Sequence, residues 1–276
     1  LVILFSCLAM GIPVAISLGL ASISTILLFA DQSLLSLAQR FFHTMQIYPL
    51  LAVPFFILAA TFMTTGGVAK RMIDFANALV GHFRGGLAMA ALLACAFFSA
   101  VSGSSPATVV AVGSVMIAGM IRSGYSERFA AGVICNAGTL GILIPPSIVM
   151  VIYGAVTETS IGNLFIAGML PGAILTLAMM ATIAVIARRQ NLPRQPRVSL
   201  KQTIHTGLEA FWGLILLVII LGGIYLGIFT PTEAAAVSAV YAFVVAVFIY
   251  KDIKLKDVPQ VLTESAKTTS MLMFII

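Results

Sequence analysis

The sequence predicts an all-α, polytopic membrane protein that contains a re-entrant helical hairpin and a broken transmembrane helix. Hydrophobic residues make up 61% of the chain and charged residues only 9%, whereas a soluble domain has about 25% charged residues. Uncharged runs longer than ~18 residues recur, and each is a candidate membrane span. Two of these runs hold helix-breaking residues near their middle. The alternating pattern of a membrane β-barrel is absent.

The uncharged runs define the expected organisation of the chain. They cover residues 1–30, 41–69, 85–121, 129–157, 159–187, 210–232 and 234–250. We expect N-terminal scaffold helices over residues 1–69, an interfacial amphipathic helix over 70–84, a transport unit over 85–187, a cytoplasmic loop over 188–209, and the start of a second repeat over 210–276. Residues 271–276 open another apolar segment, so the sequence predicts a chain that continues further.

Lysines and arginines in the short connecting segments set the orientation. The segment 188–201 carries five basic residues and no acid, and we place it in the cytoplasm. Counting crossings backwards from it gives a topology for the other charged residues. The cytoplasmic side receives Arg84, Arg122 and Arg128, and the outer side receives Asp31 and Glu158.

Residues 85–121 are too long for one span and too short for two. One span needs ~20 residues, and two spans with a turn need more than ~40, whereas this run has 37 residues between Arg84 and Arg122. A hairpin that enters from the cytoplasm and turns inside the membrane fits this length. Its midpoint reads AVSGSSPAT, in which Gly103 and Pro106 break helices and serines supply oxygen.

The run 129–157 is interrupted by the stretch NAGTLGILIPPSIVM. Pro145 and Pro146 cannot donate backbone hydrogen bonds, and a proline in a helix clashes with the carbonyl four residues earlier. Irregular backbone at membrane depth is tolerated only inside protein or beside a polar cavity. Unwound carbonyls suit a cation such as Na⁺. If the hairpin tip meets this break, the two form an uncharged, oxygen-rich cage. Asn136, one turn earlier, either serves that site or makes an interhelical bond.

Two similar segments, here called the internal echo, lie near the two ends of the chain. LVILFSCLAMGIP from Leu1 resembles LVIILGGIYLGIFTP from Leu217, a spacing of 216 residues. The echo predicts a helix break at Gly11-Ile12-Pro13. In the second copy, residues 230–233 read as a capping box, so one helix should end near Gly227 and the next should start near Pro231. The chain would then hold one repeat and a fraction.

The residues give little support for a catalytic, metal-binding or nucleic-acid-binding function. No Ser-His-Asp set and no paired carboxylates lie in an apolar run, and Cys7, Cys95 and Cys135 are widely separated. We therefore expect no enzyme, no cofactor and no transition metal. The net charge of +6 is spread over short loops and indicates topology rather than nucleic-acid binding. A channel and a proton-coupled or otherwise coupled two-hairpin anion carrier remain alternatives to Na⁺ coupling.

These motifs also carry a family resemblance. SGSSPATVVAVGSVM from Ser102, NAGTLGILIPPSIVMVIYG from Asn136, PFFILAATFMTTGG from Pro54 and GIFTPTEAAAVSAVYA from Gly227 resemble the large membrane subunit of tripartite ATP-independent periplasmic (TRAP) transporters. The resemblance implies an inverted-repeat, elevator-type secondary transporter in a bacterial or archaeal inner membrane. It implies Na⁺-driven uptake of an organic acid, of C4-dicarboxylate or sialic-acid type.

The resemblance also implies partners and site residues. The partners would be a small four-helix membrane subunit, a periplasmic substrate-binding protein, the organic acid and membrane lipid. Na⁺, as the coupling ion, would be held largely by backbone oxygens at the hairpin tip and the unwound helix. Carried over, the ion-binding residues are Ser102, Gly103, Ser104, Ser105, Thr139, Gly141, Leu143, Ile144, Pro145 and Pro146. The substrate-binding candidates are Asn136, Ser105 and Ser147.

Overall fold

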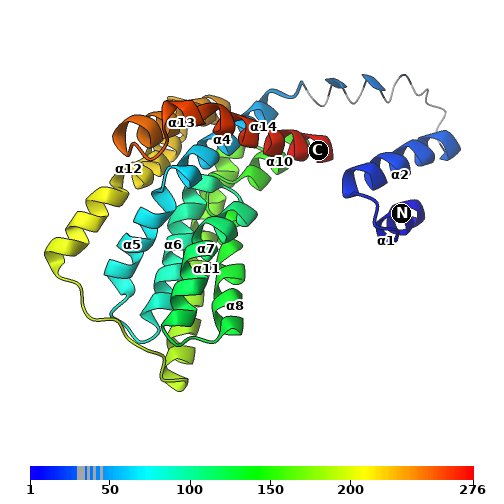
Figure 1. Cartoon of the computed structure of the whole chain (residues 1–276). Helices are drawn as coiled ribbons and strands as arrows, with labels where there is room; N and C mark the ends of the chain where they lie inside the picture. The colour runs from blue at the N-terminus through cyan, green and yellow to red at the C-terminus, as the bar shows by residue number, and fades with distance from the viewer. Residues whose placement is uncertain (30–34, 36–37, 40–41, 44–45) are drawn as a thin grey trace.

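The computed structural model describes residues 1–29, 35, 38–39, 42–43 and 46–276, and every element in its described part is helical (Figure 1). In order these are α1 (Val2–Ala9), α2 (Val14–Phe29), η1 (Tyr48–Leu51), α4 (Ala52–Thr65), α5 (Val68–Val80), α6 (Gly86–Ser102), α7 (Ser105–Arg122), α8 (Glu127–Gly138), α9 (Leu140–Leu143), α10 (Ile148–Thr157), α11 (Ile161–Arg189), α12 (Leu200–Tyr225), α13 (Pro231–Val244), η2 (Val245–Ile249), η3 (Leu255–Asp257) and α14 (Val258–Ile275).

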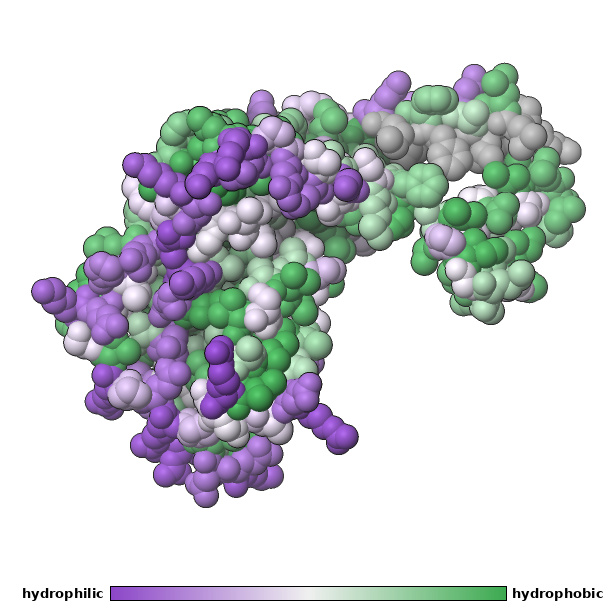
Figure 2. Space-filling view, viewed as in Figure 1, coloured by the Kyte–Doolittle hydropathy of each residue, from purple (hydrophilic) through white to green (hydrophobic). Residues whose placement is uncertain are grey.

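Length and composition make several of these helices candidate membrane spans. Among the described residues, five helical stretches qualify, and a sixth is counted if the bent pair Glu127–Leu143 and Ile148–Thr157 forms one span. The 29-residue α11 is the longest of these candidate spans and the least covered by protein, because only 17% of its most apolar window is buried. Much of the surface in Figure 2 is likewise hydrophobic. This is the surface expected of a multi-pass membrane protein, because lipid tails solvate apolar side chains.

Helices α6, α7, α8 and α11 form a bundle with their basic ends together (Figure 1). Two backbone hydrogen bonds join the α5–α6 turn to the segment after α11: Gly85 N–H donates to the Pro193 carbonyl, and Gln195 N–H donates to the Gly81 carbonyl, both at 3.3 Å. These bonds place the neighbourhoods of Arg84 and of the basic segment 188–201 at one end of the bundle. That is the arrangement predicted from the loop charges.

Both helix breaks predicted from the internal echo are present. α1 ends at Ala9 and α2 begins at Val14. Likewise, α12 ends at Tyr225 and α13 begins at Pro231. Thr230 and Glu233 form the predicted capping box, with Glu233 N–H donating to Thr230 Oγ1 at 3.3 Å and Thr230 N–H donating to the Glu233 carboxylate at 2.8 Å. Such reciprocal bonds satisfy backbone donors at a helix start.

Some boundaries differ from the sequence prediction. The predicted loop of residues 188–209 is shorter, because α11 runs through Arg189 and α12 begins at Leu200. Ser199 caps α12 by accepting a bond from Gln202 N–H at 3.3 Å. The amphipathic helix predicted over 70–84 is α5, Val68–Val80, which buries one apolar face. Asp31, predicted in an outer loop, lies outside the described residues.

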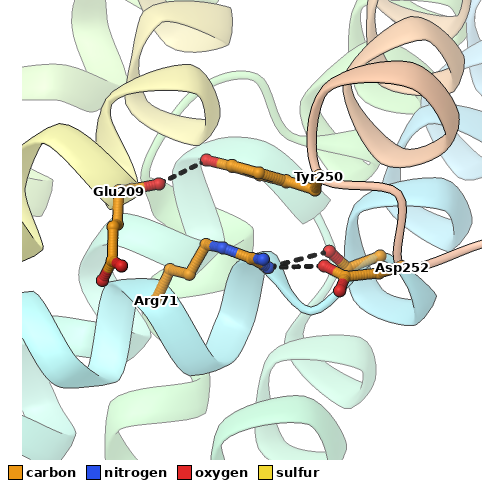
Figure 3. A network of polar contacts seen from close by, with 5 residues as sticks. Arg71, Glu209, Tyr250 and Asp252 are labelled. Carbon is orange, nitrogen blue, oxygen red and sulfur yellow. Dashed lines mark hydrogen bonds and ion pairs between the residues drawn. The ribbon is translucent and has the colours of Figure 1, made fainter.

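A charged network ties α5 to α12 and to the segment that precedes α14 (Figure 3). Arg71 Nη1 lies 2.6 Å from Asp252 Oδ2, and the guanidinium carbon sits 3.9 Å from the centre of the Tyr250 ring. The Tyr250 hydroxyl in turn donates to the Glu209 backbone carbonyl. This network joins three parts of the chain at the protein periphery, since the side chains of the ion pair remain 24% and 35% exposed.

Candidate ion-binding site at the hairpin tip

The helix pair α6–α7 turns over two residues, Gly103 and Ser104. Gly103 ends α6 in the left-handed conformation, with φ of 60°, and its N–H donates to the Ser99 carbonyl at 2.9 Å. Ser104 is extended and precedes α7, which begins at Ser105 with Pro106 in its first turn. A side chain at Gly103 would disfavour this conformation. The SGSSP motif therefore specifies a tight turn between antiparallel helices.

The second predicted break is also present. α9 ends at Leu143, Ile144 and Ser147 are extended, and α10 resumes at Ile148 after a bend of 40°. The Pro145–Pro146 peptide bond is cis. In the described part of the chain, no hydrogen bond ends on the carbonyl oxygens of residues 143–146. Pro145 and Pro146 have no N–H for the carbonyls of Gly141 and Ile142, and the bend leaves the carbonyls of residues 143–146 without the donors of residues 147–150.

The hairpin tip and the break meet through their backbones. Ile148 N–H, at the start of α10, donates to the Gly103 carbonyl at 3.1 Å. Gly141 is pressed against the tip, because a Cβ there would lie 2.7 Å from the Ser104 carbonyl carbon and 2.8 Å from Ser105 N. Real Cβ atoms do not approach backbone so closely. Only glycine at position 141 permits this contact, so the sequence brings two irregular segments into one site.

Three buried hydroxyl groups lie just below the turn. Thr108 Oγ1 is 2.9 Å from the Ser104 carbonyl, 3.0 Å from Ser102 Oγ and 3.4 Å from Ser99 Oγ. Ser99 and Thr108 are fully buried, and Ser102 is 1% exposed. Sequence reasoning missed Ser99 and Thr108. Their spacing was a usable signal, because Ser99 precedes Ser102 by one helical turn and Thr108 follows Ser104 by four residues.

The predicted ion ligands at the tip fall into two groups. The Ser104 carbonyl is engaged by Thr108 N–H at 3.0 Å as well as by its hydroxyl, and the Ser102 hydroxyl belongs to the same network. The hydroxyls of Ser104 and Ser105 take part in no hydrogen bond within the described residues and are half-buried. They are the free side-chain oxygens at the tip.

Ser147 is the polar side chain at the break itself. It is fully buried, and its Oγ has no hydrogen-bond partner among the described residues. A buried hydroxyl left unpaired costs roughly 1–3 kcal/mol. It lies between Pro146 and Ile148, the two residues that approach Gly103 at the tip.

Two other predicted site residues point elsewhere. Asn136 and Thr139 are exposed, and both bond within α8: the Asn136 amide donates to the Gly132 carbonyl at 2.8 Å, and Thr139 Oγ1 donates to the Asn136 carbonyl at 2.7 Å. Asn136 lines a 530 Å³ cavity between α6, α8 and α11, together with Arg128. The structure does not join these two side chains to the tip.

Helix α11 packs directly against the break through two glycines. A Cβ at Gly168 would lie 2.6 Å from the Leu143 carbonyl oxygen, and one at Gly172 would lie 2.9 Å from the Ile144 side chain. Sequence reasoning missed this pair, although glycines four residues apart are a known signal of close helix packing. Ile144 and Pro145 also form part of the wall of a 370 Å³ apolar cavity bounded by α6, α11 and α12.

The tip stops about 10 Å short of the far end of α11, the length of seven helical residues. At 1.5 Å per residue, α6 is about 26 Å long and α11 about 43 Å long. Gly168, which lies beside the break, is only seven residues from the first residue of α11. α10 continues past the tip to Thr157 and Glu158, where a 780 Å³ cavity opens against η1 and the start of α13.

The potential ligands at the tip and break are uncharged oxygen atoms of carbonyl and hydroxyl groups. Residues 85–121 and 129–157 contain no Asp, Glu, His or Lys, and no group of His, Cys, Asp and Glu that could hold a metal occurs in the described residues. Carbonyl and hydroxyl oxygens are ligands for hard cations rather than for zinc or copper. A monovalent cation fits best, because no carboxylate is present to balance a higher charge.

Comparison with known proteins agrees on one family. The model of the family described as "Tripartite ATP-independent periplasmic transporter, DctM component" matches residues 1–276. The C4-dicarboxylate TRAP transporter large permease protein DctM of Pseudomonas aeruginosa is 64% identical over 260 residues, which cover 94% of this chain and 61% of that protein.

Two further relatives extend the comparison. The C4-dicarboxylate TRAP transporter large permease protein DctM of Vibrio cholerae is 55% identical, over 100% of this chain and 65% of that protein. The ectoine/5-hydroxyectoine TRAP transporter large permease protein UehC of Ruegeria pomeroyi is 42% identical, over 98% and 62%. The chain spans less than two thirds of the length of each of these relatives.

Proposed function

The chain belongs to the DctM component family of tripartite ATP-independent periplasmic transporters, and from this premise we propose that the protein imports an organic acid by Na⁺ symport. The family consists of transporter permeases rather than enzymes, and the chain is a multi-pass inner-membrane protein.

One observation carries the Na⁺ assignment: the hairpin tip is bonded to the broken helix beside carbonyls that have lost their helical partners. The proposed ion lies between the hydroxyls of Ser104 and Ser105 and the carbonyls of residues 141–146, with the Ser147 hydroxyl as a further ligand. Unwound carbonyls of discontinuous membrane helices are a recurrent Na⁺ site in secondary transporters. The Ser104 carbonyl is left out, because Thr108 already occupies it.

Na⁺ is favoured over a proton as the coupling ion. A proton-coupled site needs a group that takes up and releases a proton within the cycle. The runs that build the tip and break hold no carboxylate and no histidine. A cage of neutral oxygens binds a cation without any titration, so its occupancy should follow the sodium concentration rather than pH.

The proposed mechanism is an elevator in which the α6–α11 unit moves as a body. Its support is that the tip, the break and α11 pack on one another, whereas α4 makes its most extensive contacts with α13 and α14. The α6–α7 pair is proposed to be re-entrant, because α11 extends about 10 Å beyond the level of the break. The inverted-repeat assignment draws on the internal echo, since Gly11 and Gly227, 216 positions apart, both have positive φ.

The proposed substrate is a C4-dicarboxylate. The relatives at 64% and 55% identity are named for that class, whereas the relative at 42% is named for ectoine. The proposed partners are a periplasmic substrate-binding protein and a small membrane subunit, as the word tripartite in the family description suggests.

The test is uptake by the full-length protein reconstituted with both partners in liposomes. A panel of succinate, malate, fumarate, sialic acid and ectoine is offered with an inward Na⁺ gradient, a K⁺ gradient or a pH gradient. We expect succinate-class uptake only with Na⁺. Uptake driven equally by a pH gradient in K⁺ would overturn the sodium assignment, and uptake restricted to ectoine or sialic acid would overturn the substrate class.

A further inference from the structure

The hydroxyl of Thr108 holds one particular peptide group of the hairpin tip. Thr108 Oγ1 carries a single proton and lies 2.9 Å from the Ser104 carbonyl, so it donates there. Its lone pairs can accept from Ser102 Oγ at 3.0 Å and from Ser99 Oγ at 3.4 Å. Every bond in this set has a donor and an acceptor, and the group is buried. The network is complete without water.

The Ser104 carbonyl is fixed from two directions. Thr108 donates to it twice, from N–H at 3.0 Å and from its hydroxyl at 2.9 Å. On the other side, Gly141 lies so close that a Cβ would be 2.8 Å from the same oxygen. A carbonyl oxygen has two lone pairs, and both are taken. This oxygen lies between Thr108 and Gly141 and has no lone pair left for an ion.

From this geometry we propose that Thr108 is a positioning residue for the ion site. By holding the Ser104 carbonyl in two hydrogen bonds, it fixes the turn so that the tip offers the hydroxyls of Ser104 and Ser105 to the ion. The proposal rests on the proposed Na⁺ symport, and it adds a residue that does not itself touch the ion. It also changes the expected ligand set, because the tip supplies side-chain oxygens where backbone oxygens were expected.

An ordinary helix-surface role would look different. Thr64 in α4 also donates to the carbonyl four residues earlier, at 2.7 Å, but its hydroxyl has no second hydroxyl partner among the described residues. Such bonds are common for threonine in helices and have little consequence. Thr108 differs because its acceptor is the residue that caps α7 and forms the turn.

The experiment compares T108V, T108S and T64V with the wild type in the full-length protein reconstituted with its partners. Succinate uptake is measured over a range of Na⁺ concentrations. T108V keeps the side-chain shape and removes the hydroxyl, and we expect its half-saturating Na⁺ concentration to rise about tenfold, the size of one lost buried hydrogen bond. Its maximal rate should stay within about twofold. T108S should resemble the wild type, as should T64V.

Hydrogen–deuterium exchange over residues 99–109 is read in the same variants. We expect faster exchange in T108V but not in T108S. Equal Na⁺ dependence and equal exchange in T108V and wild type would overturn the positioning role. Equal losses in T108V and T108S would also overturn it, because the retained hydroxyl would then not matter. A wild type that needs no Na⁺ would count against the symport itself, and the exchange data would still decide whether Thr108 orders the tip.

Discussion

The hairpin tip and the outer surface of α5 differ in how they join helices: the tip does so through uncharged backbone contacts, and α5 does so through an ion pair. At the tip, Gly103 and Gly141 let backbone approach backbone, and the runs that build it carry no charged side chain. At α5, Arg71 pairs with Asp252 and stacks on Tyr250 at a half-exposed surface. The first region exposes oxygen without charge, and the second joins helices through charge.

The difference follows from depth. A charged side chain at the centre of a membrane costs several kcal/mol, whereas a carbonyl offers partial charge with a much smaller desolvation cost. A transport site that must empty and refill therefore gains from neutral ligands. Near the surface, water screens the ion pair of Arg71, so it costs little and contributes little. Substitutions in the two regions should consequently change different measurements.

The largest effect is expected from G141A. A methyl group at position 141 would overlap the backbone of Ser104 and Ser105, so it should push the tip from the break and reduce Na⁺-driven uptake more than about a hundredfold. The matched control is G119A in α7, where an added Cβ meets nothing within 4 Å. Uptake is compared at equal amounts of folded protein, measured by size-exclusion chromatography. Normal uptake by G141A would show that close contact between tip and break is dispensable.

A smaller effect is expected from S147A. If the Ser147 hydroxyl is an ion ligand, its loss should raise the half-saturating Na⁺ concentration about tenfold. Without Na⁺, the variant should melt at the same temperature as the wild type or slightly higher, because an unpaired buried hydroxyl has been removed. S238A is the control, since Ser238 is equally buried but bonds to the Ala235 carbonyl at 3.0 Å. An unchanged sodium dependence in S147A would remove Ser147 from the site.

The smallest effect is expected from R71Q. Loss of a half-exposed ion pair and of a stacking contact should lower the free energy of unfolding by about 1 kcal/mol. The sodium dependence of uptake should not change. Thermal unfolding of R71Q, D252N and the double variant isolates the coupling between Arg71 and Asp252, which added salt should weaken. A change in the half-saturating Na⁺ concentration of R71Q would contradict the claim that the α5 ion pair is independent of the ion site.

Features set by local chemistry were predictable from the sequence. Gly103 and the proline pair 145–146 interrupt helices wherever they occur, and Thr230 with Glu233 forms a cap from four consecutive residues. The start of α12 was misplaced because uncharged runs were used as the guide. That helix begins with charged turns containing Lys201, His205 and Glu209, although its Ser199 cap was present in the sequence.

Features set by tertiary packing were not predictable in detail. The contact of Gly141 with Ser104 joins residues 37 positions apart, and no local pattern states which face of the tip receives the glycine. For the same reason the sequence could not show that the Ser104 carbonyl is occupied by Thr108. It also could not show that Asn136 bonds back to its own helix. Composition identified which segments matter, and packing determined which of their atoms are free.

The most direct test is a high-resolution structure of the full-length protein in Na⁺, with a matched structure in K⁺. The account predicts an ion in the Na⁺ structure between the hydroxyls of Ser104 and Ser105 and the carbonyls of residues 141–146, with the Ser104 carbonyl still bonded to Thr108. The ion should be absent or weaker in K⁺. A Na⁺ structure with no ion there, or with α9 and α10 joined as one regular helix away from the tip, would contradict it.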